Sequence, residues 1–206
     1  KKESKPLELP QCSNGTLHLE SRTYKVTQQL KIPEACNISS NGATLLLSAP
    51  LLFSKTARFE GKLSVKGLGS LEGPCFWFRE DAFIQSSAEM HFADCHNVAK
   101  DSYAFGGAIC VRGNLTVTGN LSIHNCSATH GGGIYVDKRF ANSGGEIQIS
   151  GSLAKHDGGA INVYHNFEHL GGNIIISNAS ANQYGGGIYV YHNFEHLGGN
   201  IIISNA

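Results

Sequence analysis

The strongest constraint on this chain is an internal duplication. The segment VYHNFEHLGGNIIISNA, from Val163 to Ala179, recurs without change from Val190 to Ala206, which is a period of 27 residues. Two series of fainter copies keep similar spacing. They comprise the glycine motifs that begin at Gly106, Gly131, Gly158 and Gly185, and the apolar segments that begin at Asn120, Glu146, Asn173 and Asn200. Self-similarity at such a period is the signature of a repeat architecture.

Each repeat holds two short apolar segments in which the side chains alternate. Ile134 and Val136 are expected to face one way and Tyr135 the other, and the segment that begins at Glu146 alternates similarly. A period of two indicates strands rather than helices. A repeat of two or three strands cannot bury its own apolar face. Neighbouring repeats must therefore stack and share a core. The sequence therefore predicts an all-β parallel β-helix solenoid with coils of about 27 residues.

The regular repeats cover Phe105 to Ala206, and irregular coils with the same alternation precede them. We expect an amino-terminal cap region at residues 1–40 and the β-helix at residues 41–206. The sequence stops directly after a strand, and an uncapped edge strand can template pairing with other chains. We therefore expect the array to continue into further repeats.

Charge and hydropathy exclude some partners. Lys plus Arg and Asp plus Glu both number 16, so no net charge steers the chain to nucleic acid. The most apolar stretch, from Ala43 to Phe53, is shorter than the roughly 20 residues that a transmembrane helix needs. We expect no membrane span in this segment and no nucleic-acid partner.

The glycine motifs fit tight bends, where positive φ or a missing side chain is required. Asn125, Asn178 and Asn205 occupy one equivalent position after a strand. Stacked amides at that position would form an Asn ladder. We expect Asn125 and Asn178 to be turned inward, so that their N-x-S/T motifs are not glycosylated.

The cysteines all lie in the first 126 residues, without the CxxC or Cys/His spacing of a zinc site. Disulfides are the favoured interpretation. Aligning adjacent coils places Cys95 over Cys126, although the sequence allows other connectivities. The expected bridges are Cys95 with Cys126, Cys12 with Cys36, and Cys75 with Cys110.

Further N-x-S/T motifs begin at Asn14, Asn37, Asn114 and Asn120, and we expect glycosylation there if the source is eukaryotic. A chain rich in Asn, Ser and Thr also produces such motifs by chance. Together with the expected disulfides, they predict an extracellular or cell-surface location.

The glycine motifs resemble the GGA[ILV] repeats of chlamydial polymorphic outer membrane proteins and, more loosely, the pectin-lyase-like β-helix superfamily. The resemblance covers about Phe105 to Val190. It implies a right-handed coil, three parallel sheets and an adhesive or surface-exposed passenger role. The FxxN motif of that family is not reproduced, because here Asn125 follows Ile123 by two positions. Cysteines and N-x-S/T motifs also suit a eukaryotic surface protein, so bacterial adhesin activity is not carried over.

The motif HNFEH contains the HxxEH order of some zinc peptidases, whose chemistry needs both histidines on one helix face. Here the motif is expected between strands and occurs twice, which favours a structural role. Stacking leaves a weak candidate for a surface metal site, to be weighed against a solvated loop, and we expect no cofactor. The candidate ligands are His165, Glu168, His169, His192, Glu195 and His196.

Acidic clusters of the kind that polysaccharide-processing enzymes use are not visible in the sequence. The chain has five aspartates, none of them adjacent or two apart on a strand, namely Asp81, Asp94, Asp101, Asp137 and Asp157. We interpret Asp137 with Arg139 as a solvated turn rather than a catalytic pair, and we predict no catalytic residue.

A stripe of tyrosines could stack on sugars, or it could be a packing ladder between coils. Its members are Tyr135, Tyr164, Tyr189 and Tyr191. We therefore expect a non-catalytic surface module with an adhesive or structural role, binding a glycan or a cell-surface protein. The alternative is a carbohydrate-binding or polysaccharide-processing β-helix protein.

Overall fold

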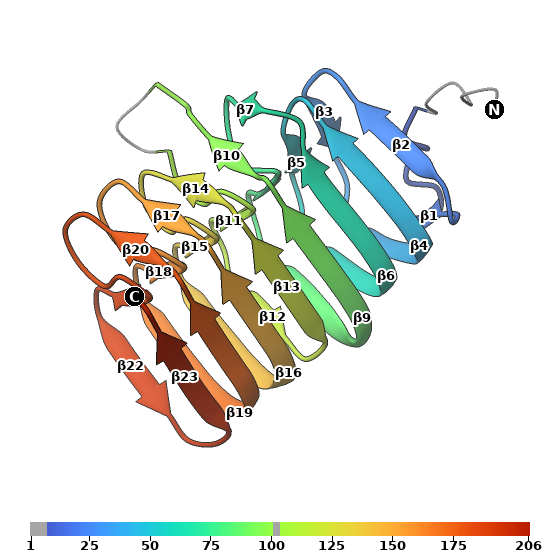
Figure 1. Cartoon of the computed structure of the whole chain (residues 1–206). Helices are drawn as coiled ribbons and strands as arrows, with labels where there is room; N and C mark the ends of the chain where they lie inside the picture. Colours follow the sequence, from blue (N-terminus) through green and yellow to red (C-terminus); the bar gives the residue numbers. More distant parts are fainter. Residues whose placement is uncertain (1–7, 101–103) are drawn as a thin grey trace.

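The computed structural model describes residues 8–100 and 104–206, and these form a parallel β-helix with three sheets (Figure 1). The sheets contain eleven, seven and five strands, and we call them the wide, middle and narrow sheets. The named strands pair in parallel from the first coil to the last, as β1 does with β4 and β19 with β23. The fold class predicted from the repeat is confirmed.

The strands of each sheet follow one another along the stack. The wide sheet comprises β1 (Thr16–Leu19), β2 (Thr23–Val26), β4 (Cys36–Leu47), β6 (Ala57–Gly67), β9 (Ala82–Ala93), β12 (Leu115–Val117), β13 (Asn120–His124), β16 (Arg139–Ser150), β19 (Asn166–Ser177), β22 (Asn193–His196) and β23 (Asn200–Ser204). The middle sheet comprises β3 (Leu30–Ile32), β5 (Leu51–Phe53), β8 (Phe76–Phe78), β11 (Ile109–Val111), β15 (Ile134–Val136), β18 (Ile161–Val163) and β21 (Ile188–Val190). The narrow sheet comprises β7 (Ser70–Leu71), β10 (His96–Asn97), β14 (Ser127–Ala128), β17 (Leu153–Ala154) and β20 (Ser180–Ala181).

One regular coil runs from the wide sheet through the narrow sheet to the middle sheet, as β16, β17 and β18 do before β19 begins the next coil. The register follows the period of the sequence. Phe140 pairs with Phe167, and Phe167 pairs with Phe194. The duplicated segments therefore lie directly over each other.

The core lies between the three sheets and is filled by the inward positions of the alternating strands. Ile134 and Val136 are fully buried, as the alternation predicted. The rings of Phe140 and Phe167 stack with centroids 4.9 Å apart, and Phe167 stacks on Phe194 at the same distance. Identical side chains thus pack in columns along the helix axis.

The glycine pairs are explained by two separate requirements. Gly131 has a φ of +64°, which disfavours any residue with a side chain. At the next position, a Cβ added to Gly132 would lie 2.3 Å from the carbonyl oxygen of Gly159 in the next coil. Positive φ and close approach of the coils therefore both act within one turn, as expected.

The first coils join the same sheets. Strands β1 and β2 pair with β4, and β3 pairs with β5. Strand β4 crosses residue 40, where the boundary between cap and β-helix was predicted. The division into residues 1–40 and 41–206 remains a prediction.

The Asn ladder forms, but its side chains are not turned inward. Asn125, Asn178 and Asn205 have φ near +50°, and Nδ2 of Asn205 donates to Oδ1 of Asn178 at 3.3 Å. Gly151 takes the equivalent position in one coil. Asn125 and Asn178 are exposed, because the left-handed residue lies at the outside of the turn between two sheets. Their expected inward orientation is therefore wrong.

The cysteine pairing is only partly as expected. Cys12 and Cys36 are bonded, but the second disulfide joins Cys75 to Cys95, and Cys110 and Cys126 are free. The expected bonds from Cys95 to Cys126 and from Cys75 to Cys110 are therefore wrong.

The predicted register of Cys95 and Cys126 is nevertheless correct, since the amide of Ser127 donates to the carbonyl of Cys95 at 3.0 Å. In-register neighbours in parallel strands keep their Cβ atoms about 4.8 Å apart, whereas a disulfide prefers about 3.8 Å. Cys75 instead approaches Cys95 from the preceding coil, where it lies directly before β8 of the middle sheet, with Cα atoms 5.9 Å apart. Cys110 pairs in register with Trp77, two positions beyond Cys75.

Candidate functional site

The candidate site is a stripe along the outside of the glycine turns, which we call the glycine-turn stripe. Its first column holds the residue before each glycine pair, and its second column holds the middle residue of the following strand of the middle sheet. The first column is Phe105, His130, Asp157 and Tyr184, and the second is Cys110, Tyr135, Asn162 and Tyr189.

At the centre of the stripe, His130 and Asp157 bridge adjacent coils. Nδ1 of His130 lies 3.0 Å from Oδ2 of Asp157, and their side chains are 19% and 15% exposed. Burial lowers the pKa of His130, although the Asp157 charge opposes this effect. Oδ1 of Asp157 is buried and has no hydrogen-bond partner among the residues that the structure describes. A neutral imidazole therefore orients a carboxylate that keeps one unused acceptor.

Towards the amino terminus, the stripe contains a packed cation–aromatic cluster. The ring of Tyr135 lies 4.2 Å from that of Phe105, and the Arg112 guanidinium lies 4.8 Å from the Phe105 centroid and 5.9 Å from that of Tyr135. The Tyr135 hydroxyl is 3.4 Å from Oδ1 of Asp137. Tyr135 is 5% exposed, so its ring cannot provide the expected platform for a sugar.

Towards the carboxyl terminus, the stripe carries two tyrosines. The rings of Tyr184 and Tyr189 stack with centroids 5.9 Å apart, and Tyr184 is 63% exposed. Tyr184 pairs with Asp157 of the preceding coil. Burial raises the pKa of Tyr189, and the nearby charge of Asp157 adds to this effect. An aromatic pair therefore lies beside the partly unsatisfied carboxylate.

The duplicated HNFEH motif does not gather its residues into one site. His165 stacks on His192 at 4.9 Å and is exposed, whereas His169 is fully buried and stacks on His196 at 5.1 Å. The motif lies at the start of a strand, so the side chains of Glu168 and His169 point to opposite faces. Within residues 8–100 and 104–206, no three His, Cys, Asp or Glu side chains could hold a metal ion.

Two acidic residues considered as candidates, Glu168 and Asp81, have structural partners. Arg139 donates from Nε to Glu168 at 2.6 Å, which pairs the guanidinium with the HNFEH glutamate rather than with Asp137. This contact lowers the pKa of Glu168. Asp81 accepts hydrogen bonds from Asn114, while Asp101 lies outside the described residues.

Two of the predicted sugar-stacking residues form a ladder. Tyr164 and Tyr191 are 41% and 57% exposed, and their rings stack with centroids 4.9 Å apart at 9°. His192 meets both rings edge-on. The two rings therefore stack between adjacent coils, as in a packing ladder.

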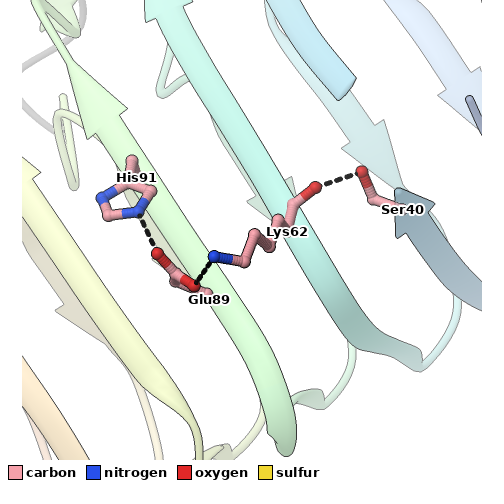
Figure 2. Close-up of polar contacts among 4 residues, drawn as sticks. All are labelled: Ser40, Lys62, Glu89 and His91. Atoms are coloured by element: carbon pink, nitrogen blue, oxygen red, sulfur yellow. Dashed lines mark hydrogen bonds and ion pairs between the residues drawn. The ribbon is translucent and has the colours of Figure 1, made fainter. Parts of the chain in front are cut away.

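Polar side chains on the outer face of the wide sheet connect β6 to β9, as Figure 2 shows for Lys62, Glu89 and His91. Nζ of Lys62 lies 2.7 Å from Oε2 of Glu89, and Nε2 of His91 lies 3.2 Å from Oε1 of the same carboxylate. The hydrogen bond from Lys62 lowers the pKa of Glu89. The hydroxyl of Ser40, which is buried on the inner side of the sheet, donates to the Lys62 carbonyl and connects β4 to β6.

The predicted glycosylation sites differ in accessibility. Asn14, Asn37 and Asn120 are exposed. Asn114 is partly buried, and its Nδ2 donates to Oδ1 of Asp81 at 3.1 Å. Glycosylation at all four positions remains a prediction.

The first column of the stripe was missed in the sequence. Its signal was present, because Phe105, His130, Asp157 and Tyr184 immediately precede the glycine pairs and share their spacing. Four different side chains at one repeat position do not look like a motif. Only stacking brings His130 onto Asp157.

Comparison with protein-family models, curated proteins and solved structures gives no significant match to this chain. In the part of the chain that the structure describes, no helix combines the length and apolar character needed to cross a membrane.

Proposed function

We propose that this chain is a non-catalytic extracellular or cell-surface module with an adhesive or structural role. The observation that carries the proposal is the outer face of the wide sheet, which extends through the stacked coils from β1 to β23 (Figure 1). Such a face allows binding to be spread over several coils. Two disulfides favour an oxidising compartment. The resemblance of the glycine motifs to surface-passenger repeats also supports an adhesive role.

Adhesion of the full chain to cultured cells and to extracellular-matrix coats tests this proposal. Ser64 is exposed on the outer face of the wide sheet, and Ser64→Arg should lower binding several-fold by placing a long charged side chain there. The matched control is Leu153→Arg, because Leu153 is 51% exposed on the narrow sheet. Absence of binding to every surface, or loss only in the control variant, would contradict the proposal.

Carbohydrate binding is a second candidate function, supported by the exposure of Tyr164 and Tyr191. A glycan array with the full chain tests it, and Tyr164→Ala should remove the signal. A blank array would leave protein adhesion as the proposed role. Polysaccharide processing has weaker support, since the described aspartates outside the stripe have structural partners.

A further inference from the structure

We propose that Arg79, Arg112 and Lys138 form a binding site for a linear sulfated polysaccharide. The three residues lie on the turns that lead from the middle sheet to the wide sheet, which we call the middle-to-wide turns. All three belong to coils that have a neighbouring coil on each side, so the site lies along the side of the solenoid. This inference rests on the proposed adhesive function and specifies the ligand class of one contact.

Hydrogen bonds between coils stack these turns in one column. The amides of Arg79 and Arg112 each donate to a carbonyl of the coil before, at 3.0 and 2.9 Å. The amide of Lys138 in the next coil donates to the carbonyl of Gly113 at 3.3 Å. Parallel neighbours are about 4.8 Å apart. Three consecutive coils therefore present cationic side chains to a ligand that extends along the helix axis.

The middle-to-wide turns carry an excess of positive charge. Within residues 54–58, 79–83, 112–116 and 137–141 there are six basic and three acidic residues, whereas the whole chain has no formal net charge. The basic residues are Lys55, Arg58, Arg79, Arg112, Lys138 and Arg139, and the acidic residues are Glu80, Asp81 and Asp137. A local excess of one charge attracts a ligand of the opposite charge even where the whole chain is neutral.

The carboxylates of these turns already have partners within the protein. Glu80 pairs with Lys55 at 2.8 Å, and Asp81 accepts hydrogen bonds from Asn114. Asp137 is hydrogen-bonded to a tyrosine hydroxyl. These contacts engage acidic groups that would otherwise compete with a ligand for the neighbouring cations.

The cations of the proposed site are available to a ligand. Arg79 and Lys138 are exposed, and neither forms an ion pair within the part of the chain that the structure describes. Arg112 is half-buried, with its guanidinium 4.8 Å from the ring centroid of Phe105 and 5.9 Å from that of Tyr135. Because stacking holds this guanidinium in place, binding costs less side-chain entropy. A planar guanidinium can also donate two parallel hydrogen bonds to an oxyanion such as sulfate.

A polysaccharide suits these turns better than a single-stranded nucleic acid. Nucleic-acid bases bind by stacking on open aromatic faces. Here the guanidinium of Arg58 lies 4.7 Å from the ring centroid of Phe83, and that of Arg112 lies over Phe105. The two disulfides favour an oxidising compartment, where sulfated polysaccharides are common extended polyanions.

Titration of a fluorescent heparin oligosaccharide with the full chain, followed by anisotropy at near-physiological salt, tests the site. Arg79→Gln should weaken binding about tenfold, the equivalent of one charged hydrogen bond. Lys138→Gln should weaken it about threefold, because an ammonium group lacks the forked geometry of a guanidinium. Binding should fall as salt is added, since ions screen exposed charges.

The matched control is Lys155→Gln, which makes the same change in net charge at an exposed residue directly after β17 of the narrow sheet. It should bind heparin as the unmodified chain does. Equal weakening by Lys155→Gln would show non-specific charge attraction and overturn the proposal, as would unchanged binding of both Arg79→Gln and Lys138→Gln. All three side chains are exposed, so the variants should fold, which circular dichroism checks.

Two further probes test the ligand class. Hyaluronate, which carries carboxylates without sulfates, and a single-stranded oligonucleotide should both bind far more weakly than heparin. Equal affinity for hyaluronate would refute the assignment to sulfate, and equal affinity for the oligonucleotide would refute the assignment to a polysaccharide.

The two proposals fail separately. If the polysaccharide site is wrong while adhesion is correct, the double variant Arg79→Gln with Lys138→Gln will adhere to cells as well as the unmodified chain does. If adhesion itself is wrong, no surface will bind the unmodified chain, whatever the heparin titration shows.

Discussion

His130 of one coil donates a hydrogen bond through Nδ1 to Oδ2 of Asp157 in the next coil, at 3.0 Å. The contact joins two turns that are 27 residues apart in the sequence and adjacent in space. Two imidazoles, those of the partly buried His130 and the fully buried His169, have pKa values lowered mainly by burial. They give the stability of the fold a dependence on pH.

We expect the free energy of unfolding to fall as the pH decreases through about 6.5, the ordinary pKa of histidine. A His169 pKa below that value means that the unfolded chain binds more protons in this window, so acid favours unfolding. Urea denaturation at neutral and mildly acidic pH measures the effect. His169→Asn should flatten the profile, because Asn142 occupies the equivalent position one coil earlier. An equal effect from replacing the exposed His18 by Gln would refute this assignment.

Because the glycine turns of adjacent coils approach closely, alanine substitutions at neighbouring glycines should differ in their effect on stability. Gly132→Ala should destabilise the fold by about 1–3 kcal/mol, because the new Cβ would lie 2.3 Å from the Gly159 carbonyl oxygen. Gly133→Ala should cost less, since alanine stands at the equivalent positions Ala108 and Ala160. Thermal melts of the two variants measure the difference, and equal melting temperatures would disprove it.

The free thiols should be inert in the folded chain. Burial raises the pKa of Cys110 and of Cys126 to about 12, so neither supplies thiolate at neutral pH. An alkylating reagent should label both only after unfolding. Non-reducing peptide mapping should find Cys75 linked to Cys95, and Cys126→Ser should leave that link intact. A peptide linking Cys95 to Cys126 would contradict the structure.

The phenylalanine column should be a main source of stability in the later coils. Phe167→Ala should cost about 3–5 kcal/mol, because Phe167 is fully buried between Phe140 and Phe194. Leu170→Ala, a change three residues away at a side chain that is 40% exposed, should cost about 0.5 kcal/mol or less. The urea midpoints of both variants give these values. If both variants lose a similar free energy of unfolding, the phenylalanine column is not a main source of stability in these coils.

Much of the fold could be predicted because it depends on the pattern within each strand and on the spacing of neighbouring repeats. Alternation decides which side of a strand each residue faces, and stacking in register then places Ile134 and Val136 in the core. The same local logic predicted the glycine turns and the stacking of Asn178 on Asn205. It did not show which side of the turn faces solvent, so the exposure of Asn125 and Asn178 was missed.

The sequence by itself determined that this chain forms stacked coils of alternating strands, because an exact period and a period of two constrain every coil alike. Only the tertiary structure decided that Cys75 pairs with Cys95, and that Tyr135 is covered by its neighbours. The same holds for the contact of His130 with Asp157. These relationships depend on distances between different sides or layers of the solenoid, and a one-dimensional spacing does not contain them.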